Sequence, residues 1–230
     1  MNPISFESDY DIERSRLTTF FRLIIAIPWL IWVYIYGIGA QIVAIIAWFA
    51  MLFTGRYPEG MYSFVAGYLR LATRVSAYAA LLTDELPSFG AGPEPQYPVK
   101  VDVAPPQERY NRWKTFFKLV LYFPQALIVN VLAYVLIAAA FISWFRILFS
   151  GRQSITMHEA LVVSTAYFVR STGFLLLLTE AHPRMLEVQR FDPPADAPGL
   201  PPATAAPSPQ VPEQAGGPPP PPQPPPPAQS

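Results

Sequence analysis

The sequence predicts an all-α membrane protein with a tandem repeat, on three observations. Between Arg22 and Arg56 there is no charged residue for 33 positions, which exceeds the roughly 20 apolar residues that one spanning helix needs. A shift of 96 positions aligns residues 16–87 with residues 112–183 without a gap, and 21 of the 72 pairs are identical. From Pro193 to Ser230, 17 of 38 residues are proline and none is basic. We therefore expect two copies of one membrane unit and a disordered tail.

The internal duplication sets the expected domain boundaries. Residues 1–92 form the first membrane repeat, residues 93–107 a linker, residues 108–192 the second repeat and residues 193–230 the Pro-rich tail. Both copies run in the same direction along the chain, so the repeat is parallel rather than inverted.

Each repeat is expected to begin with a transmembrane helical hairpin, at residues 18–54 and 115–150. The first of these stretches is too long for one perpendicular span and just long enough for two short ones. Gly37 and Gly39 are the only break in the first copy, since glycine allows the chain to reverse; the second copy offers only Asn130. The alternative is one long, tilted helix, kinked at Pro28 or Pro124.

A third helix follows each hairpin, at residues 59–83 and 156–179. In the first copy, a helical projection places Arg70 and Arg74 on one face and Phe64 and Leu71 on the other. This pattern predicts an amphipathic helix in the membrane interface, with its arginines toward headgroups or water. In the second copy Arg170 is the only charge between residues 160 and 179, so that helix could instead span the membrane with Arg170 facing protein.

The positions of the positive residues predict the orientation. Arginines and lysines flank both hairpins, and the expected turns carry none. By the positive-inside rule, both termini and the linker lie in the cytoplasm, and the chain is a multi-pass protein of the bacterial inner membrane. The first sixteen residues include four acidic side chains, unlike the basic start of an export signal.

Three short stretches and the Pro-rich tail have patterns of their own. Residues 4–6, 97–103 and 186–191 alternate apolar and polar side chains, which favours three short strands that pair into a small cytoplasmic sheet. The Pro-rich tail is either a polyproline ligand for an aromatic-lined groove on a protein partner or a solvated spacer.

No residue constellation reaches the standard of a catalytic, cofactor or metal site. The chain has no cysteine, and His158 and His182 lack metal-binding spacing. Its 16 basic residues are matched by 16 acidic ones, too little positive excess for a nucleic-acid partner. The long apolar stretches contain no carboxylate, which disfavours an ion-coupled transporter.

Three arginines are the candidate binding residues. At headgroup depth, Arg70, Arg74 and Arg170 could hold lipid phosphates through bidentate hydrogen bonds. The alternative is that they are snorkelling anchors or pair with Asp84, Glu85 and Glu180, and Arg22 and Lys118 are likewise expected to snorkel.

The string RLTTFFRLIIAIPWLIWVY and the later stretch WFAMLFTGRYPEG resemble the bacterial integral-membrane family labelled domain of unknown function forty-three eighty-nine. The resemblance is close over residues 14–89 and looser over residues 99–185. The second copy departs from the first at Gln153-Ser154, where the first has Tyr57-Pro58, so a role of that step would be confined to the first copy. The resemblance implies a membrane location and tandem copies, and it supplies no functional residues.

Three functions are therefore compared. The preferred one is a non-catalytic scaffold or accessory subunit in contact with membrane lipids and, through the tail, with a protein partner. The second is a lipid- or small-solute-handling protein that uses the interfacial arginines. The third, a membrane enzyme, would need an acid, base or nucleophile that the sequence does not bring together.

Overall fold

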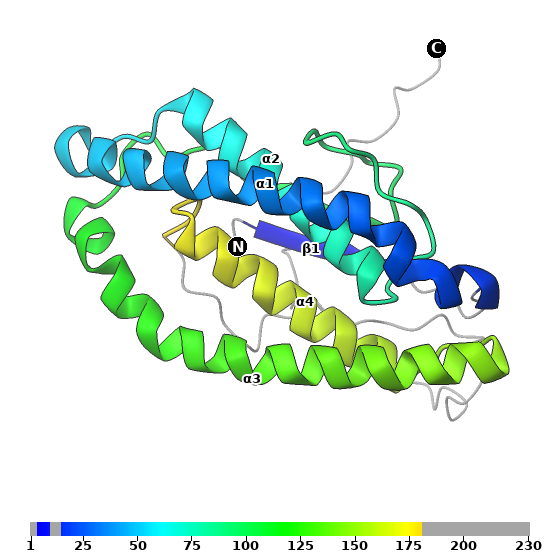
Figure 1. Ribbon diagram of the computed structural model, residues 1–230. Helices are drawn as coiled ribbons and strands as arrows, with labels where there is room; N and C mark the ends of the chain where they lie inside the picture. The colour runs from blue at the N-terminus through cyan, green and yellow to red at the C-terminus, as the bar shows by residue number, and fades with distance from the viewer. Residues whose placement is uncertain (1–3, 10–14, 181–230) are drawn as a thin grey trace, which may run out of the picture. The chain divides into compact units, whose positions relative to one another are not determined.

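The structure, a computed structural model, describes residues 4–9 and 15–180, without the side chains of residues 119–121. This part of the chain is mostly helical, as predicted, and each repeat contains one long helix and one shorter helix, with a short strand ahead of each long helix (Figure 1). The elements in order are β1 (Ile4–Ser8), α1 (Arg16–Thr54), α2 (Glu59–Ala79), β2 (Val99–Val103), α3 (Arg112–Ser150) and α4 (Ile155–Leu175).

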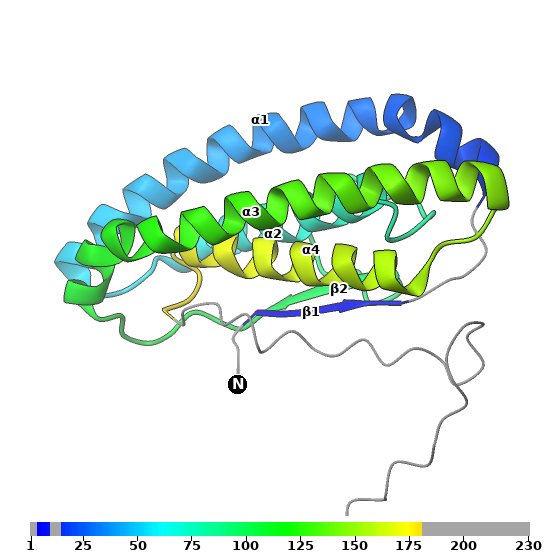
Figure 2. The ribbon, with the colours of Figure 1, turned by 90° about the horizontal axis from the view of Figure 1, so that it is seen from below.

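The predicted helical hairpins are wrong, because α1 and α3 are each one continuous helix of 39 residues. At 1.5 Å per residue, each is about 58 Å long. Gly37 lies inside α1, and a Cβ placed on it would be 3.1 Å from the ring of Tyr68 on α2. The glycine therefore provides space for a neighbouring helix instead of a turn. Pro28 and Pro124 lie within the long helices, and α1 is visibly bowed (Figure 2).

Both long helices begin and end in the same way. A side-chain oxygen caps each start: Ser15 accepts from the Thr18 amide, and Asn111 accepts from the Trp113 and Lys114 amides. Each end is a glycine in the left-handed conformation, with φ of 71° at Gly55 and 72° at Gly151. The duplicated sequence thus encodes equivalent helix boundaries in the two copies.

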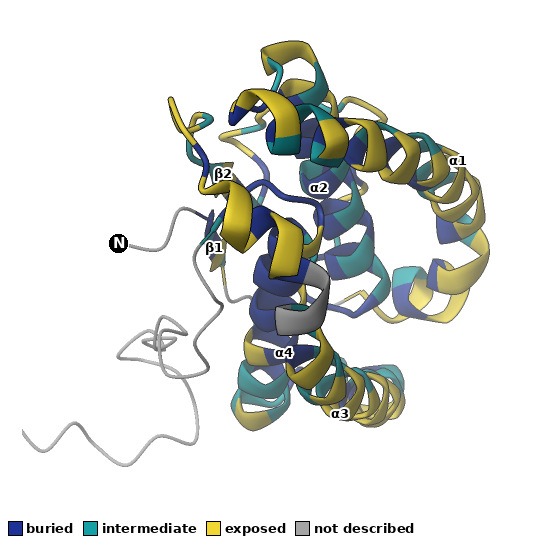
Figure 3. Cartoon of the chain, turned by 90° about the vertical axis from the view of Figure 1, so that its left-hand side faces the viewer, coloured by how far each residue is buried: buried dark blue, intermediate teal, exposed yellow. Residues whose placement is uncertain are grey.

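The shorter helices α2 and α4 form an inner layer, between the long helices and the strands (Figures 2 and 3). On α2, both Leu71 from the predicted apolar face and Arg74 from the predicted polar face are buried. In the structure α2 is therefore an interior helix, and its expected position at the membrane interface is not what the packing shows. Both helices also end four residues earlier than predicted.

The strands form a two-stranded antiparallel ribbon, β1–β2, in which Phe6 pairs with Val101. Two of the three predicted strands are thereby confirmed; the third, at residues 186–191, and the tail at residues 193–230 lie outside the described residues. Ile4, Phe6 and Val101 are buried against the inner helices, whereas Glu7 and Asp102 point outward and are exposed. This alternation gives the ribbon one apolar and one polar face.

The two repeats bind each other through reciprocal contacts. Trp48 on α1 donates its indole N–H to the Thr115 carbonyl at 3.0 Å. Trp144 on α3, the equivalent residue, donates to the Thr19 carbonyl at 3.1 Å. The start of each long helix thus lies beside the end of the other, as in an isologous dimer.

The contact between α4 and β1 yields a stability prediction. A Cβ added to Gly173 would lie 2.2 Å from Ile4 Cδ1, so Gly173→Ala should lower the free energy of unfolding by about 1–3 kcal/mol. Ile4→Val removes that Cδ1 atom, and in this background the same glycine substitution should cost much less. Thermal unfolding followed by circular dichroism measures both costs.

Gly60 is the matched control, since an added Cβ there meets nothing within 4 Å. Gly60→Ala should stabilise α2 by about 0.5–1 kcal/mol. An equal cost of Gly173→Ala with Ile4 and with Val at position 4 would contradict the packing described here.

Candidate functional site

The outward faces of α1 and α3 are exposed, as the yellow colour in Figure 3 shows, and large apolar side chains make up most of these faces. Within the described residues, Arg16–Thr54 and Tyr122–Ser150 are the helical segments that are long and apolar enough to cross a membrane, and the mean hydropathy of their most apolar windows is 2.0 and 2.4. Only 22% and 11% of their most apolar windows are buried. Monomeric water-soluble proteins rarely expose so continuous an apolar surface.

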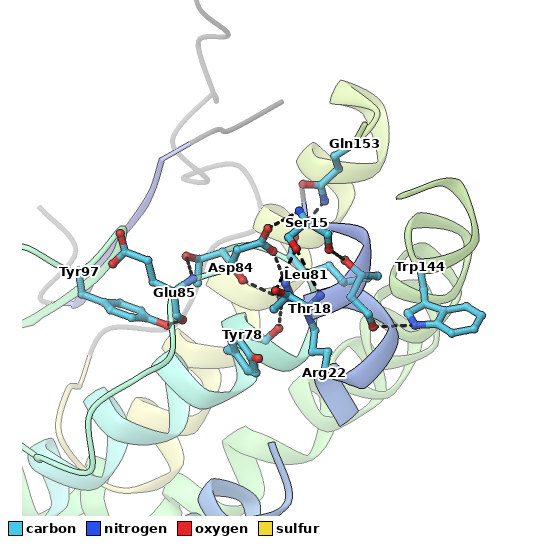
Figure 4. Close-up of polar contacts among 12 residues, drawn as sticks. Ser15, Thr18, Arg22, Tyr78, Leu81, Asp84, Glu85, Tyr97, Trp144 and Gln153 are labelled. Atoms are coloured by element: carbon cyan, nitrogen blue, oxygen red, sulfur yellow. Dashed lines mark hydrogen bonds and ion pairs between the residues drawn. The ribbon is translucent and has the colours of Figure 1, made fainter. Parts of the chain in front are cut away.

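Arg22 joins the second turn of α1 to the chain after α2 (Figure 4). Its guanidinium donates to the Tyr78 carbonyl at 2.5 Å and to the Thr83 carbonyl at 2.7 Å, and it forms an ion pair with Asp84. Only 1% of the residue is exposed. Arg22 is therefore an interior tether, and the expectation that it snorkels to the membrane surface is wrong.

Lys118, the equivalent residue of the second copy, is also buried rather than snorkelling. Its ammonium donates to the Thr179 carbonyl at 2.7 Å and lies 4.6 Å from the ring centre of Phe174. Glu180 accepts from the Asn111 amide at 2.7 Å, as the equivalent Asp84 does from the Ser15 amide at 3.0 Å, but its ion pair is with exposed Lys114, at 3.9 Å, and not with Lys118. The buried cation of the second copy is therefore less fully compensated than that of the first.

Burial has a direct electrostatic consequence at this lysine. Desolvation lowers the pKa of Lys118 to about 7, and the negative charge of Glu180 opposes that shift only in part. A nearby anion would favour the protonated form and raise the pKa.

Just after α2 and α4 the chain turns at a residue with a positive φ, and a side chain of the opposite repeat donates a hydrogen bond to each turn. Leu81 and Leu177 have positive φ of 66° and 67°, a left-handed conformation that bulky side chains rarely adopt. The side-chain amide of Gln153 donates to the Leu81 carbonyl at 3.1 Å. The Tyr57 hydroxyl, at the equivalent position of the other copy, lies 3.4 Å from the Leu176 carbonyl. The two copies therefore use different side chains for a similar cross-repeat contact.

The three predicted headgroup-binding arginines occupy different surroundings. Arg70 and Arg74 line one pocket of about 240 Å³ beside β2. Arg74 is 3% exposed, donates to the Gly90 and Gly92 carbonyls at 2.6 and 3.1 Å, and pairs with Glu94. Arg170, its equivalent on α4, is 4% exposed. Binding of lipid phosphates by these residues stays a prediction; for Arg74, groups of the chain itself already surround the guanidinium.

A larger cavity, of about 550 Å³, lies between α1 and the second repeat. Its walls are mainly apolar, and Lys118 is the charged residue among them. Sequence reasoning missed this cavity because it placed Lys118 at the surface. The available signal was that Lys118 and Glu180 replace Arg22 and Asp84 together. The lining residues are Gln41, Ala44, Ile45, Trp48, Phe49, Tyr68, Lys118, Thr172, Leu175, Leu176 and Leu177.

Within residues 4–9 and 15–180, no three His, Cys, Asp or Glu side chains come together as a metal site would require. His158 is buried on α4, and His182 lies outside the described residues.

Comparisons with known proteins identify the repeat and nothing further. The family model described as "Domain of unknown function (DUF4389)" matches residues 16–91 and 112–186. No curated protein and no solved structure matches the chain. The two matched segments coincide with the duplication.

The unequal tethers predict unequal effects of charge removal. Asp84→Asn leaves the guanidinium of Arg22 buried without a counter-charge, so it should lower the free energy of unfolding by about 2–3 kcal/mol. Glu180→Gln, the matched change, disturbs a pair with exposed Lys114 and should cost at most about 1 kcal/mol. Chemical unfolding in detergent micelles, followed by circular dichroism, tests the difference. Equal losses would show that the two tethers are equivalent.

Proposed function

We propose that this chain, which belongs to the DUF4389 family, is a non-catalytic scaffold or accessory subunit embedded in one leaflet of a membrane. In this proposal α1 and α3 lie in the plane of the bilayer, with their outward faces in contact with lipid. The β1–β2 ribbon faces water. The observation that carries the proposal is the opposite polarity of the two outer layers.

The layer of long helices suits a lipid environment along its whole length. Leu17 at the start of α1 is 71% exposed, Ile35 near its middle 56%, and Phe53 at its end 77%. Exposed arginines lie at or just beyond both ends of each long helix: Arg16, Arg56, Arg112 and Arg152. An interfacial helix buries its apolar face about 5–10 Å into the boundary of headgroups and acyl chains.

The ribbon argues against helices that stand along the membrane normal. β1 and β2 run alongside the inner helices (Figure 2), so upright helices would carry the strands into the hydrocarbon region. Exposed Glu7 and Asp102, together with open strand edges, would then lie in lipid, where unsatisfied backbone groups are very costly. An in-plane arrangement keeps these groups in water and replaces the multi-pass topology expected from two hairpins.

The expected orientation toward the cytoplasm fits this arrangement, since both termini and the linker would lie on one side. Contact with a protein partner through the tail at residues 193–230 also remains part of the proposal.

Cysteine labelling distinguishes in-plane from spanning helices. The chain has no cysteine, so single Arg16→Cys and Arg56→Cys variants, at exposed polar positions, mark the two ends of α1 without background. With a membrane-impermeant maleimide applied to inverted vesicles and to intact spheroplasts, we expect both positions to react from the cytoplasmic side only. Reaction of the two ends from opposite sides would refute the in-plane arrangement.

Deletion of residues 193–230 tests the partner function separately. We expect the truncated protein to remain in the membrane fraction and to lose the proteins that co-purify with the full chain. An unchanged set of co-purifying proteins would exclude docking through the tail.

A further inference from the structure

The 550 Å³ cavity has the properties of a ligand site, and the proposed scaffold function does not use it. Its volume falls within the roughly 300–1,000 Å³ typical of small-molecule sites. The walls combine aliphatic and aromatic side chains such as Ile45, Phe49 and Leu175 with the single charged residue Lys118. Lys118 is 6% exposed, so its charge is held away from bulk water.

The two repeats differ in the groups that compensate their buried cations. In the first repeat, the buried guanidinium of Arg22 meets two carbonyls and the carboxylate of Asp84. In the second, the ammonium of Lys118 donates to one carbonyl, and the carboxylate of Glu180 pairs with exposed Lys114 and not with Lys118. A carboxylate beside Lys118 would restore the compensation that the first repeat has within its own chain.

We propose that this cavity binds a single-chain amphiphile with a carboxylate head, a long-chain fatty acid. The carboxylate lies at the Lys118 ammonium, and the alkyl chain lies along the apolar wall formed by α1 and α4.

The composition of the walls favours this ligand class over other lipids. One lysine matches the single charge of a carboxylate, whereas a phosphate monoester carries more charge than the site balances. Few polar side chains line the cavity, among them Gln41 and Thr172, so a large polar headgroup would find few hydrogen-bond partners. Burial of the alkyl chain contributes about 0.8 kcal/mol per CH₂ group, whether the chain lies in the membrane or in the cavity. The chain therefore does not favour the cavity over the bilayer, and the head group must provide the selectivity.

The low pKa of Lys118 is consistent with the same arrangement. Burial lowers this pKa to about 7, and a bound carboxylate would stabilise the ammonium form.

The test measures binding of radiolabelled palmitate to the full chain in a non-ionic detergent. We expect saturation at one palmitate per chain, and a dissociation constant at least about tenfold weaker for Lys118→Met, the loss of one charge-assisted hydrogen bond. Lys118→Arg should retain binding. Lys114→Met, which removes an exposed lysine one turn earlier on the same helix, should leave it unchanged.

Two further arms locate the ligand. Palmityl alcohol, which has the same chain without the charge, should bind wild type about tenfold more weakly than palmitate does and should be indifferent to Lys118→Met. Ile45→Trp, at a half-exposed lining position, should weaken palmitate binding by filling the cavity.

Several results would overturn the proposal. They are non-saturating uptake of palmitate, equal affinity for palmitate and palmityl alcohol, and equal losses in Lys114→Met and Lys118→Met. Lys118-dependent binding of dioleoylphosphatidylglycerol without binding of palmitate would also exclude a fatty acid and identify a two-chain anionic lipid instead.

Discussion

The structure depends on one constraint, which is that its two outer layers need different solvents. The exposed faces of α1 and α3 are mainly apolar along their length, and transfer of such a surface from water to lipid is favourable. The β1–β2 ribbon has charged outward positions, Glu7 and Asp102, and strand edges that need hydrogen-bond partners. The inner helices α2 and α4 separate these layers. The proposed in-plane arrangement meets this constraint by keeping one layer in lipid and the other in water.

The duplication explains how so apolar a chain builds a defined interior. Each long helix carries a buried cation near its start and a tryptophan near its end, and the tryptophans link the two copies reciprocally. The copies are nevertheless unequal, since Arg22 with Asp84 forms a closed ion pair and Lys118 with Glu180 does not. The ammonium of Lys118, which has no such pair, therefore lies at the wall of the 550 Å³ cavity. The difference between the repeats is therefore more informative about function than their similarity.

Sequence patterns predicted much of this architecture. Alternation at residues 4–6 and 97–103 identified the paired strands, and Gly55 and Gly151 identified the ends of the long helices. The hairpins were wrong because a glycine pair in a helix can provide close packing as well as a turn, and only the contact of Gly37 with Tyr68 decides between them. Burial of Arg22, Arg74 and Lys118 could not be predicted, because a basic residue in an apolar helix can snorkel or bind carbonyls from distant segments. The carbonyls of Thr83, Gly90 and Thr179 become visible as partners only in three dimensions.

The central claim is that the long helices lie in the membrane plane, and polarised infrared spectroscopy of the reconstituted full chain in oriented bilayers tests it most directly. The helices run lengthwise together (Figures 1 and 2), so their amide I transition moments report one common orientation. The account predicts dichroism for helix axes parallel to the bilayer surface. Dichroism for axes along the membrane normal would contradict it.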